Sequence, residues 1–243
     1  MALSAFNRSL GKHAARRALA AAACVALAAS VALALDPERD VTQFTQRSWN
    51  AEQGLPQNSV TAIAQGRFGY LWMGTQEGLV RFDGTTFQVF NRRNTPELHS
   101  HNVTALAVGS GAEIWVGTEG GLVGYTARGF RRLGKPDGLP SEAIVALAAA
   151  PDGSLWVGTA DAGLARIQGT KVTAFRRADG LPDDRIRALA LAPDGGLWVA
   201  TAAGLARWEG RRFRPVGPEQ GVPAREIFAV MAALDGALWF GTD

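Results

Sequence analysis

The chain has 243 residues, of which 47% are hydrophobic and 19% are charged, so it is long enough to bury a sizeable core. Four of the 25 basic residues lie in the first 34 residues, which hold no acidic residue, and the other 21 are balanced by 22 acidic residues. This balance removes charge as an argument for a nucleic-acid-binding protein. The 29 glycines, most of them in short turns between apolar runs, favour an all-β fold.

The first 34 residues have the order of a secretory signal peptide. Basic residues precede residue 18, an Ala/Leu/Val run fills 18–35, and Ala32-Leu33-Ala34 offers a cleavage site between small residues. We therefore expect a signal peptide over 1–34 and export of residues 35–243 to the periplasm. The alternatives are a retained membrane anchor, a twin-arginine signal at Arg16-Arg17 and a lipoprotein site at Cys24. Cys24 is the single cysteine, so the mature chain would hold no disulfide.

A five-residue motif, Leu/Ile-Trp-x-Gly/Ala-Thr, recurs along the rest of the chain. Its tryptophans are 43, 41, 42 and 41 residues apart. A period of about 42 residues is typical of β-propeller blades, each a sheet of four short strands. A solenoid of helix pairs has a similar period, but the segments between turns are five to seven residues long and rich in β-branched and aromatic residues. The five copies are Leu71–Thr75, Ile114–Thr118, Leu155–Thr159, Leu197–Thr201 and Leu238–Thr242.

Other features keep the same phase. Apolar strands are expected before each motif at Val60–Ala64, Val103–Val108, Ile144–Ala148, Ile186–Leu191 and Ile227–Ala232. Third strands are expected at Gly78–Phe82, Gly121–Tyr125, Gly163–Ile167 and Gly204–Trp208. Fourth strands end on the aromatic residues Phe87 and Phe90, Phe130, Phe175 and Phe213. Gly-Leu-Pro or Gly-Val-Pro then opens the next unit at Gly54, Gly138, Gly180 and Gly221.

These positions predict an all-β propeller present as an incomplete arc of four blades plus a half. The expected blades are 59–95, 96–138, 139–180, 181–221 and a partial blade over 222–243, and residues 41–58 hold an orphan closing strand and a linker. Because the last residues form the second strand of a fifth blade, we expect the chain to be an N-terminal fragment.

The motif has a packing explanation. Tryptophan is large enough to fill the wedge between blades, so we interpret the five tryptophans as packing residues rather than as ligand stackers. The small residue two positions later is expected to let a neighbouring backbone come close. The threonine suits a strand end.

Two segments resemble a known family. Trp49–Val60 (WNAEQGLPQNSV) and Gly69–Gly84 (GYLWMGTQEGLVRFDG) are similar to the two-component regulator propeller, and the similarity recurs in the later units. The resemblance covers roughly residues 41–243. It implies the periplasmic sensor region of a bacterial membrane receptor whose output is a histidine kinase or a diguanylate cyclase. It also implies a membrane span and an output domain beyond this chain, and a homodimer of the intact receptor.

No catalytic set is evident in the sequence, and we expect no enzyme activity, metal or cofactor in this chain. His99 and His101 alternate in one loop, but no cysteine or acidic cluster lies nearby. Asp183-Asp184 follows a Gly-Leu-Pro segment and is interpreted as a turn or strand start rather than as a pair of acid–base carboxylates. The recurring arginine pairs mark solvated edge strands, where charge blocks pairing between sheets. They are Arg92-Arg93, Arg131-Arg132, Arg176-Arg177 and Arg211-Arg212.

Ligand-binding residues are expected on loops between strands, because propellers bind over the central channel or on one face. Polar residues follow the tryptophan strands or lie in the segments that lead into each blade. Neighbouring polar positions are Ser59, Ser141 and Glu142. The predicted ligand-binding residues are Gln57, Asn58, Gln76, Glu77, Glu119 and Asp161.

The function expected from these observations is a periplasmic ligand-sensing module of a transmembrane signalling receptor. Its ligand would be a small molecule or a glycan, not a nucleic acid. One alternative is a secreted propeller enzyme that acts on a glycan. The other is a structural interaction propeller.

Overall fold

The structure is a computed structural model that describes residues 47–223 and 225–242. The predicted signal peptide and, apart from Arg47, the predicted strand over 41–47 lie outside these residues. The chain divides into two units, Met1–Ser48 and Trp49–Asp243, and the description below concerns the second. Among the described residues, no helix combines the length and the apolarity that a membrane crossing requires.

The second unit consists of four antiparallel sheets of four strands and a C-terminal hairpin. Each sheet has its strands in chain order, so sequential neighbours pair directly. The first blade contains β1 (Val60–Gln65), β2 (Leu71–Thr75), β3 (Gly78–Phe82) and β4 (Phe87–Phe90). The second contains β5 (Val103–Val108), β6 (Ile114–Thr118), β7 (Gly121–Thr126) and β8 (Gly129–Leu133).

The remaining strands repeat this order. The third blade contains β9 (Ile144–Ala149), β10 (Leu155–Thr159), β11 (Leu164–Gln168) and β12 (Lys171–Phe175). The fourth contains β13 (Ile186–Leu191), β14 (Leu197–Thr201), β15 (Gly204–Trp208) and β16 (Phe213–Val216). The C-terminal hairpin pairs β17 (Ala229–Ala232) with β18 (Leu238–Gly241).

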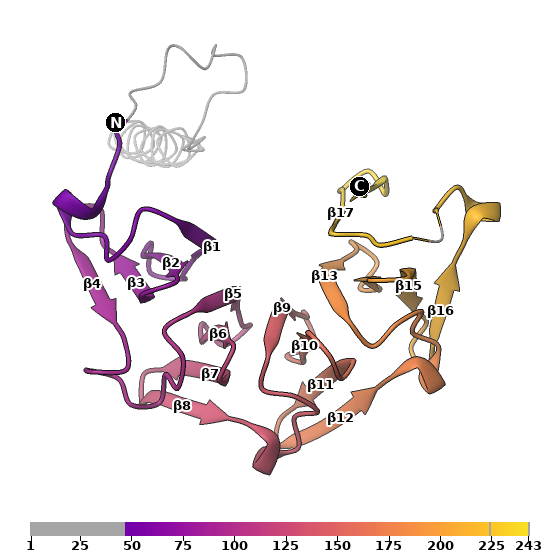
Figure 1. Cartoon of the computed structure of the whole chain (residues 1–243), viewed down its shortest axis with the longest axis horizontal. Helices are drawn as coiled ribbons and strands as arrows, with labels where there is room; N and C mark the ends of the chain where they lie inside the picture. The colour runs from indigo at the N-terminus through magenta and orange to yellow at the C-terminus, as the bar shows by residue number, and fades with distance from the viewer. Residues whose placement is uncertain (1–46, 224, 243) are drawn as a thin grey trace, which may run out of the picture. The chain divides into compact units, whose positions relative to one another are not determined.

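The blades stand side by side around a common centre (Figure 1). The first strand of each blade lies on the inner side and contacts the first strand of the next, from β1 through β5, β9 and β13 to β17. The fourth strands β4, β8, β12 and β16 run along the outer side (Figure 1). The predicted fold, an incomplete arc of four blades plus a half, is therefore confirmed.

The Gly-Leu-Pro segments have a structure that the sequence analysis did not predict. Each glycine ends a one-turn 3₁₀ helix, and its φ angle is positive, as at Gly54 (108°). The first of these helices is held by Asn50, whose side chain accepts from the backbone N–H of Glu52. A side chain at Gly180 would meet the Phe213 carbonyl oxygen at 2.0 Å. The helices are η2 (Ala51–Gln53), η3 (Lys135–Asp137), η4 (Arg177–Asp179) and η5 (Pro218–Gln220).

The small residue of the motif accommodates a side chain of the next blade. A Cβ added to Gly158 would lie 2.7 Å from Cγ2 of Ile186, the first residue of β13. Gly74 and Gly117 meet Val103 and Ile144 in the same way, at 2.6 and 2.8 Å. The expectation that a neighbouring backbone comes close here was wrong. A β-branched side chain fills the space instead, because the second strand of each blade packs against the start of the first strand of the next blade.

Trp72 and Trp156 pack between blades, as expected, whereas Trp239 in the C-terminal hairpin is 65% exposed. Trp72 and Trp156 are each 2% exposed. The Trp72 ring lies 5.1 Å from Tyr125 of the second blade, and the Trp156 ring lies 5.4 Å from Trp208 of the fourth. Such aromatic contacts add to the stabilisation from apolar burial. The interfaces between blades therefore hold the core of this unit.

The threonine of the motif closes a turn. Thr75 is fully buried, and its hydroxyl donates to the carbonyl oxygen of Gly78 and accepts from the N–H of Glu77. One side chain thus satisfies the polar groups of the loop between the second and third strands. The hydroxyls of Thr118, Thr159 and Thr201 donate to the equivalent glycine carbonyls.

Candidate functional site

Antiparallel pairing gives the unit two loop-bearing faces. The linker face carries the loops between second and third strands and the segments that lead into the first strand of each blade. The turn face carries the turns between first and second and between third and fourth strands. All six predicted ligand-binding residues lie in loops of the linker face.

The structure brings two of these six residues into contact. The side-chain amide of Gln57 donates to Oε1 of Gln76 over 3.1 Å, and the Gln76 N–H donates to Oε1 of Gln57 over 3.2 Å. Both residues are at the surface of the first blade. This pair joins the linker to the loop between β2 and β3, so it presents a fixed pair of amides to solvent.

The other four predicted residues either have other hydrogen-bond partners or are exposed. Asn58 accepts from the N–H of Ala51 over 2.8 Å and so fixes the first 3₁₀ helix. Glu119 accepts from the side chain of Asn102 over 2.9 Å in the second blade. Glu77 and Asp161 are exposed. The predicted residues therefore lie along the linker face rather than around one cavity.

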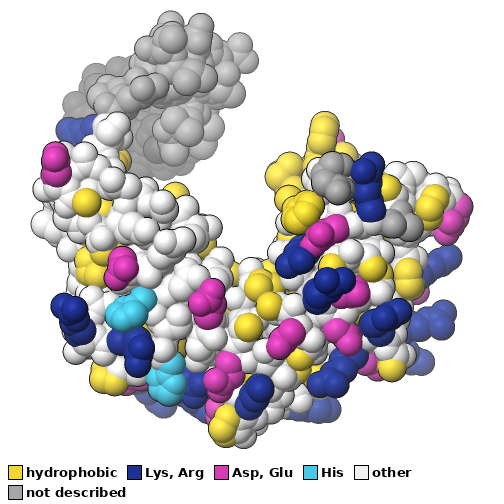
Figure 2. Space-filling view, viewed as in Figure 1, with side chains coloured by type: hydrophobic (Ala, Val, Ile, Leu, Met, Phe, Trp, Pro, Cys, Tyr) yellow, Lys and Arg dark blue, Asp and Glu magenta, His cyan; other side chains and the backbone are white. Residues whose placement is uncertain are grey.

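The linker face is mixed in charge. Figure 2 shows acidic, basic and histidine side chains interspersed on the visible side, with hydrophobic side chains gathered toward the C-terminal hairpin. The exposed side chains of that hairpin include Met231 and Trp239.

Nδ1 of His101 is buried without a hydrogen-bond partner. Within 47–223 and 225–242, no group of three residues could hold a metal ion.

Asp183, Asp184 and Arg132 form hydrogen bonds with other residues of the linkers. Asp183 accepts from both the N–H and Nε of Arg185, which lowers the pKa of that carboxyl. Asp184 accepts from the N–H of Arg177 over 2.9 Å. Burial alone would raise the pKa of Glu142, but the hydrogen bond from Arg132 (2.7 Å), the N–H of Lys135 and the charges of both residues together lower it. These contacts hold the linkers in place.

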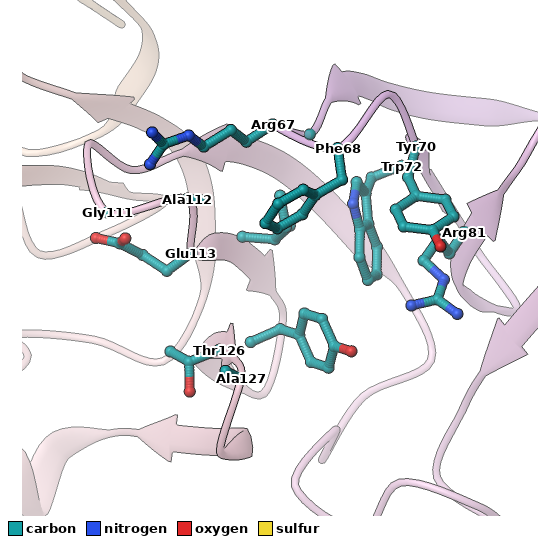
Figure 3. A pocket seen from close by; sticks show the side chains of 13 residues that line it. Arg67, Phe68, Tyr70, Trp72, Arg81, Gly111, Ala112, Glu113, Thr126 and Ala127 are labelled. Atoms are coloured by element: carbon teal, nitrogen blue, oxygen red, sulfur yellow. The ribbon is translucent and has the colours of Figure 1, made fainter.

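A cavity of about 340 Å³ lies on the turn face, between the first and second blades (Figure 3). The first blade contributes Phe68, Tyr70 and Trp72 to its aromatic lining, and β7 of the second blade contributes Tyr125. Arg81 of β3 lies with its guanidinium carbon 4.5 Å from the centre of the Tyr70 ring. Glu113 lines the cavity from the second blade. The sequence analysis did not identify this site.

The turn face also carries ion pairs that predict a dependence on pH. Asp152 accepts from the hydroxyl and the N–H of Ser154 and pairs with Arg166, and these bonds lower the pKa of its carboxyl. A carboxyl with a lower pKa in the folded state contributes stability that is complete above its unfolded pKa of about 4. That contribution is lost as the pH falls through the folded value.

Replacing Asp152 by asparagine should therefore lower Tm at pH 7 by up to about 3 °C, the range of a solvent-exposed pair. The difference from the unmodified chain should shrink below about pH 4. Thermal unfolding between pH 7 and pH 2 measures both effects, and Asp161→Asn at an exposed carboxyl is the control. A constant difference across this range would contradict the assignment.

The similarity to a known family falls on the repeated blades. The sequence pattern of the two-component regulator propeller matches residues 54–77, 138–161 and 180–203. Each match runs from the glycine that ends a 3₁₀ helix through the first and second strands, in the first, third and fourth blades. Histidine kinase P4 of Formosa agariphila is 42% identical over 65 residues, which are 27% of this chain and 5% of that protein.

Two solved structures have similar folds. The extracellular domain of a putative one-component system from B. thetaiotaomicron aligns with a TM-score of 0.62 and 22% identity, over 76% of this chain and 25% of that one. Virginiamycin B lyase from Staphylococcus aureus aligns with a TM-score of 0.58 and 17% identity, over 74% of this chain and 62% of that one. At these identities they show the fold alone. The chain spans a small part of the curated relative and a quarter of the first of these structures.

Proposed function

Because the chain carries two-component regulator propeller repeats in three of its blades, we propose that it is the ligand-sensing region of an exported bacterial signalling receptor. Its ligand is a small molecule or a glycan, and its output is a histidine kinase or a diguanylate cyclase. The chain itself binds rather than catalyses. The receptor is held in the inner membrane by parts outside this chain, and acts as a homodimer.

The match of the repeats is the observation that carries this proposal. It falls on the linkers and on the first two strands, the segments that build the linker face and the interfaces between blades. The identity to a histidine kinase supports a kinase as the output. The fold alone supports no choice between sensor and enzyme, because a lyase shares it.

The linker face is the sensing surface in this proposal. The Gln57–Gln76 pair offers donors and acceptors in a fixed geometry, and Glu77 lies beside it. Polar groups fixed by hydrogen bonds lose less conformational entropy on binding than free side chains do. Glu119 and Asp161 extend the same surface over the second and third blades.

Export is tested by fusing alkaline phosphatase to the C-terminal end of residues 1–243 in a Gram-negative host. The enzyme needs disulfides that form in the periplasm, so an exported fusion is active. Deleting residues 1–34 should abolish that activity without reducing the amount of fusion protein. An inactive full-length fusion would rule out export of the propeller.

Sensing is tested by replacing Gln76 and Glu77 together by alanine in the complete receptor. Loss of two polar contacts should raise the stimulus concentration for half-maximal output about tenfold. Lys171→Ala, an exposed residue of the turn face, is the matched control. An unchanged response at equal receptor abundance would remove these two residues from the site.

A further inference from the structure

We propose that the cavity between the first two blades binds a small carboxylate with an apolar ring. Its anionic group would take the position that a turn aspartate holds in the third and fourth blades. This proposal concerns the turn face and stands apart from the sensing surface proposed above.

The third and fourth blades share an arrangement of three residues. In the third blade, Trp156 pairs across strands with Arg166, whose guanidinium carbon lies 5.1 Å from the tryptophan ring. Nη2 of Arg166 donates to Asp152 over 2.6 Å, and Asp152 lies four residues before the tryptophan in the turn. The guanidinium is thus held by a ring on one side and by a carboxylate at its end. The fourth blade repeats this with Trp198, Arg207 and Asp194.

The first blade has the arginine without the aspartate. Trp72 pairs across strands with Arg81, but the position four residues before the tryptophan is Phe68. Nη2 of Arg81 donates to Oε1 of Gln88 over 2.5 Å. Among the described residues, no carboxylate forms an ion pair with Arg81. Because a guanidinium has five N–H donors, this leaves donors available for an anion.

The second blade has neither member of the pair. Gly111 stands at the aspartate position and Gly124 at the arginine position opposite Trp115. Gly111 and the next residue, Ala112, line the cavity. Ala112 has a φ of 72°, and it is the single described non-glycine residue with a positive φ. Gly111 and Ala112 leave room on the second-blade side of this cavity, whereas Gly124 lines a separate cavity toward the third blade. An equivalent cavity of about 340 Å³ lies between the fourth blade and the C-terminal hairpin, but there Asp194 already pairs with Arg207.

The walls of the cavity suit an apolar ring. Tyr70, Trp72 and Tyr125 contribute aromatic surface, and Figure 3 shows the Phe68 ring between Arg67 and Trp72. Phe68 is 81% exposed, so its ring is accessible to pack on a ligand in the cavity. A volume of about 340 Å³ suits a ligand with a single ring.

The charged residues of the lining determine the charge and the orientation of the ligand. Arg67 and Arg81 both line the cavity, so a cationic ligand is disfavoured even though the walls are aromatic. Arg81 already covers the Tyr70 face that a cation would occupy. The carboxylate of Glu113 would repel a carboxylate of the ligand from its part of the cavity wall. It would accept a hydrogen bond from a ligand hydroxyl at the same place. A ring with a carboxylate directed toward Arg81 fits this pattern.

The probe is phenylacetate, which joins one ring to one carboxylate, and phenylacetamide is its neutral counterpart. The isotope-labelled chain is titrated with each, and the NMR signals of the Trp72 indole N–H and the Arg81 side chain are followed. We expect saturable shifts with phenylacetate and at least about tenfold weaker binding of the amide, as a charge-assisted hydrogen bond is lost. Equal affinities for acid and amide, or no binding of phenylacetate, would overturn the proposal.

Two variants locate the site. Arg81→Gln removes the guanidinium, and Phe68→Asp supplies the carboxylate found in the later blades, so each should weaken phenylacetate binding about tenfold or more. Phe68 is at the surface, so Phe68→Asp keeps the test valid if Arg81→Gln fails to fold. Arg166→Gln in the third blade is the matched control and should bind normally. Unchanged affinity in Phe68→Asp would place the ligand elsewhere. The experiment needs no output domain, so its failure leaves the proposed sensor function standing.

Discussion

Replacing Trp156 by alanine should lower the free energy of unfolding by about 3–5 kcal/mol, the range for large aromatic side chains in cores. The side chain is 2% exposed and contacts the rings of Phe175, Trp208 and Phe213. These rings come from two blades, so its loss opens a cavity at their interface. Urea unfolding followed by circular dichroism measures the effect.

Trp239→Ala is the matched control, because this tryptophan has the same place in the motif. It is 65% exposed in the C-terminal hairpin. We expect a change below about 1 kcal/mol there. Equal effects of the two substitutions would show that the motif stabilises single blades and not their interfaces.

Gly158→Val should cost about 3 kcal/mol, the upper range for overpacking. Its Cβ would lie 2.7 Å from Cγ2 and 3.2 Å from Cβ of Ile186, so the third and fourth blades would have to move apart. Gly241→Val, where the nearest atom to an added Cβ is 3.7 Å away, should change stability by less than about 0.5 kcal/mol.

A double variant identifies the cause of the Gly158 effect. Combining Gly158→Val with Ile186→Ala should cost less than the sum of the two single substitutions, because the smaller side chain makes room for the valine. Denaturant unfolding of the four proteins gives the coupling energy. Additive effects would show that the valine acts within its own strand rather than across the interface.

The fold could be predicted from the sequence because the same strand motif recurs five times at a nearly constant spacing. The tryptophan spacing gave the blade period, and the apolar runs before each tryptophan gave the inner strands. The contact that the motif glycine makes with the next blade could not be predicted from the sequence. Which group approaches Gly158 depends on how two blades pack, and strand patterns within one blade do not contain that distance.

The 3₁₀ helices were missed for a related reason. Three residues are too few for a periodic pattern. Their shared signal is an Asp or Gln as third residue, whose side chain accepts from the N-cap N–H, followed by a glycine at positive φ, as in Gln53 and Gly54. The strand ends differed by one or two residues. The fifth inner strand begins at Ala229 rather than Ile227, and the third strand of the third blade begins at Leu164 rather than Gly163.

The candidate site was predictable only in part. Sequence reasoning gave the linker face, since loop position follows from strand order, but the contact between Gln57 and Gln76 needed coordinates. The cavity on the turn face had a signal that was overlooked. Among the five repeats, the position four residues before the tryptophan is aspartate in the last three, but Phe68 and Gly111 in the first two.

The second blade departs from the others in several independent ways. It lacks both the turn aspartate and the arginine opposite the tryptophan, and Ala112 in its turn has a positive φ. Gly111 and Ala112 line the cavity that it forms with the first blade, and Gly124 lines a cavity toward the third blade. A repeat protein can change one unit locally while the neighbouring interfaces keep the fold, so binding specificity can be placed in such a unit.

We propose that this propeller senses a ligand outside the cytoplasm for a signalling receptor. The most direct measurement is the output of the complete receptor in cells, with and without residues 49–243. A panel of small carboxylates and oligosaccharides is added to the medium, and receptor abundance is measured in parallel. We expect at least one compound to change the output of the intact receptor and none to change the output of the form that lacks residues 49–243. A receptor that lacks the propeller and still responds as the intact one does would contradict it.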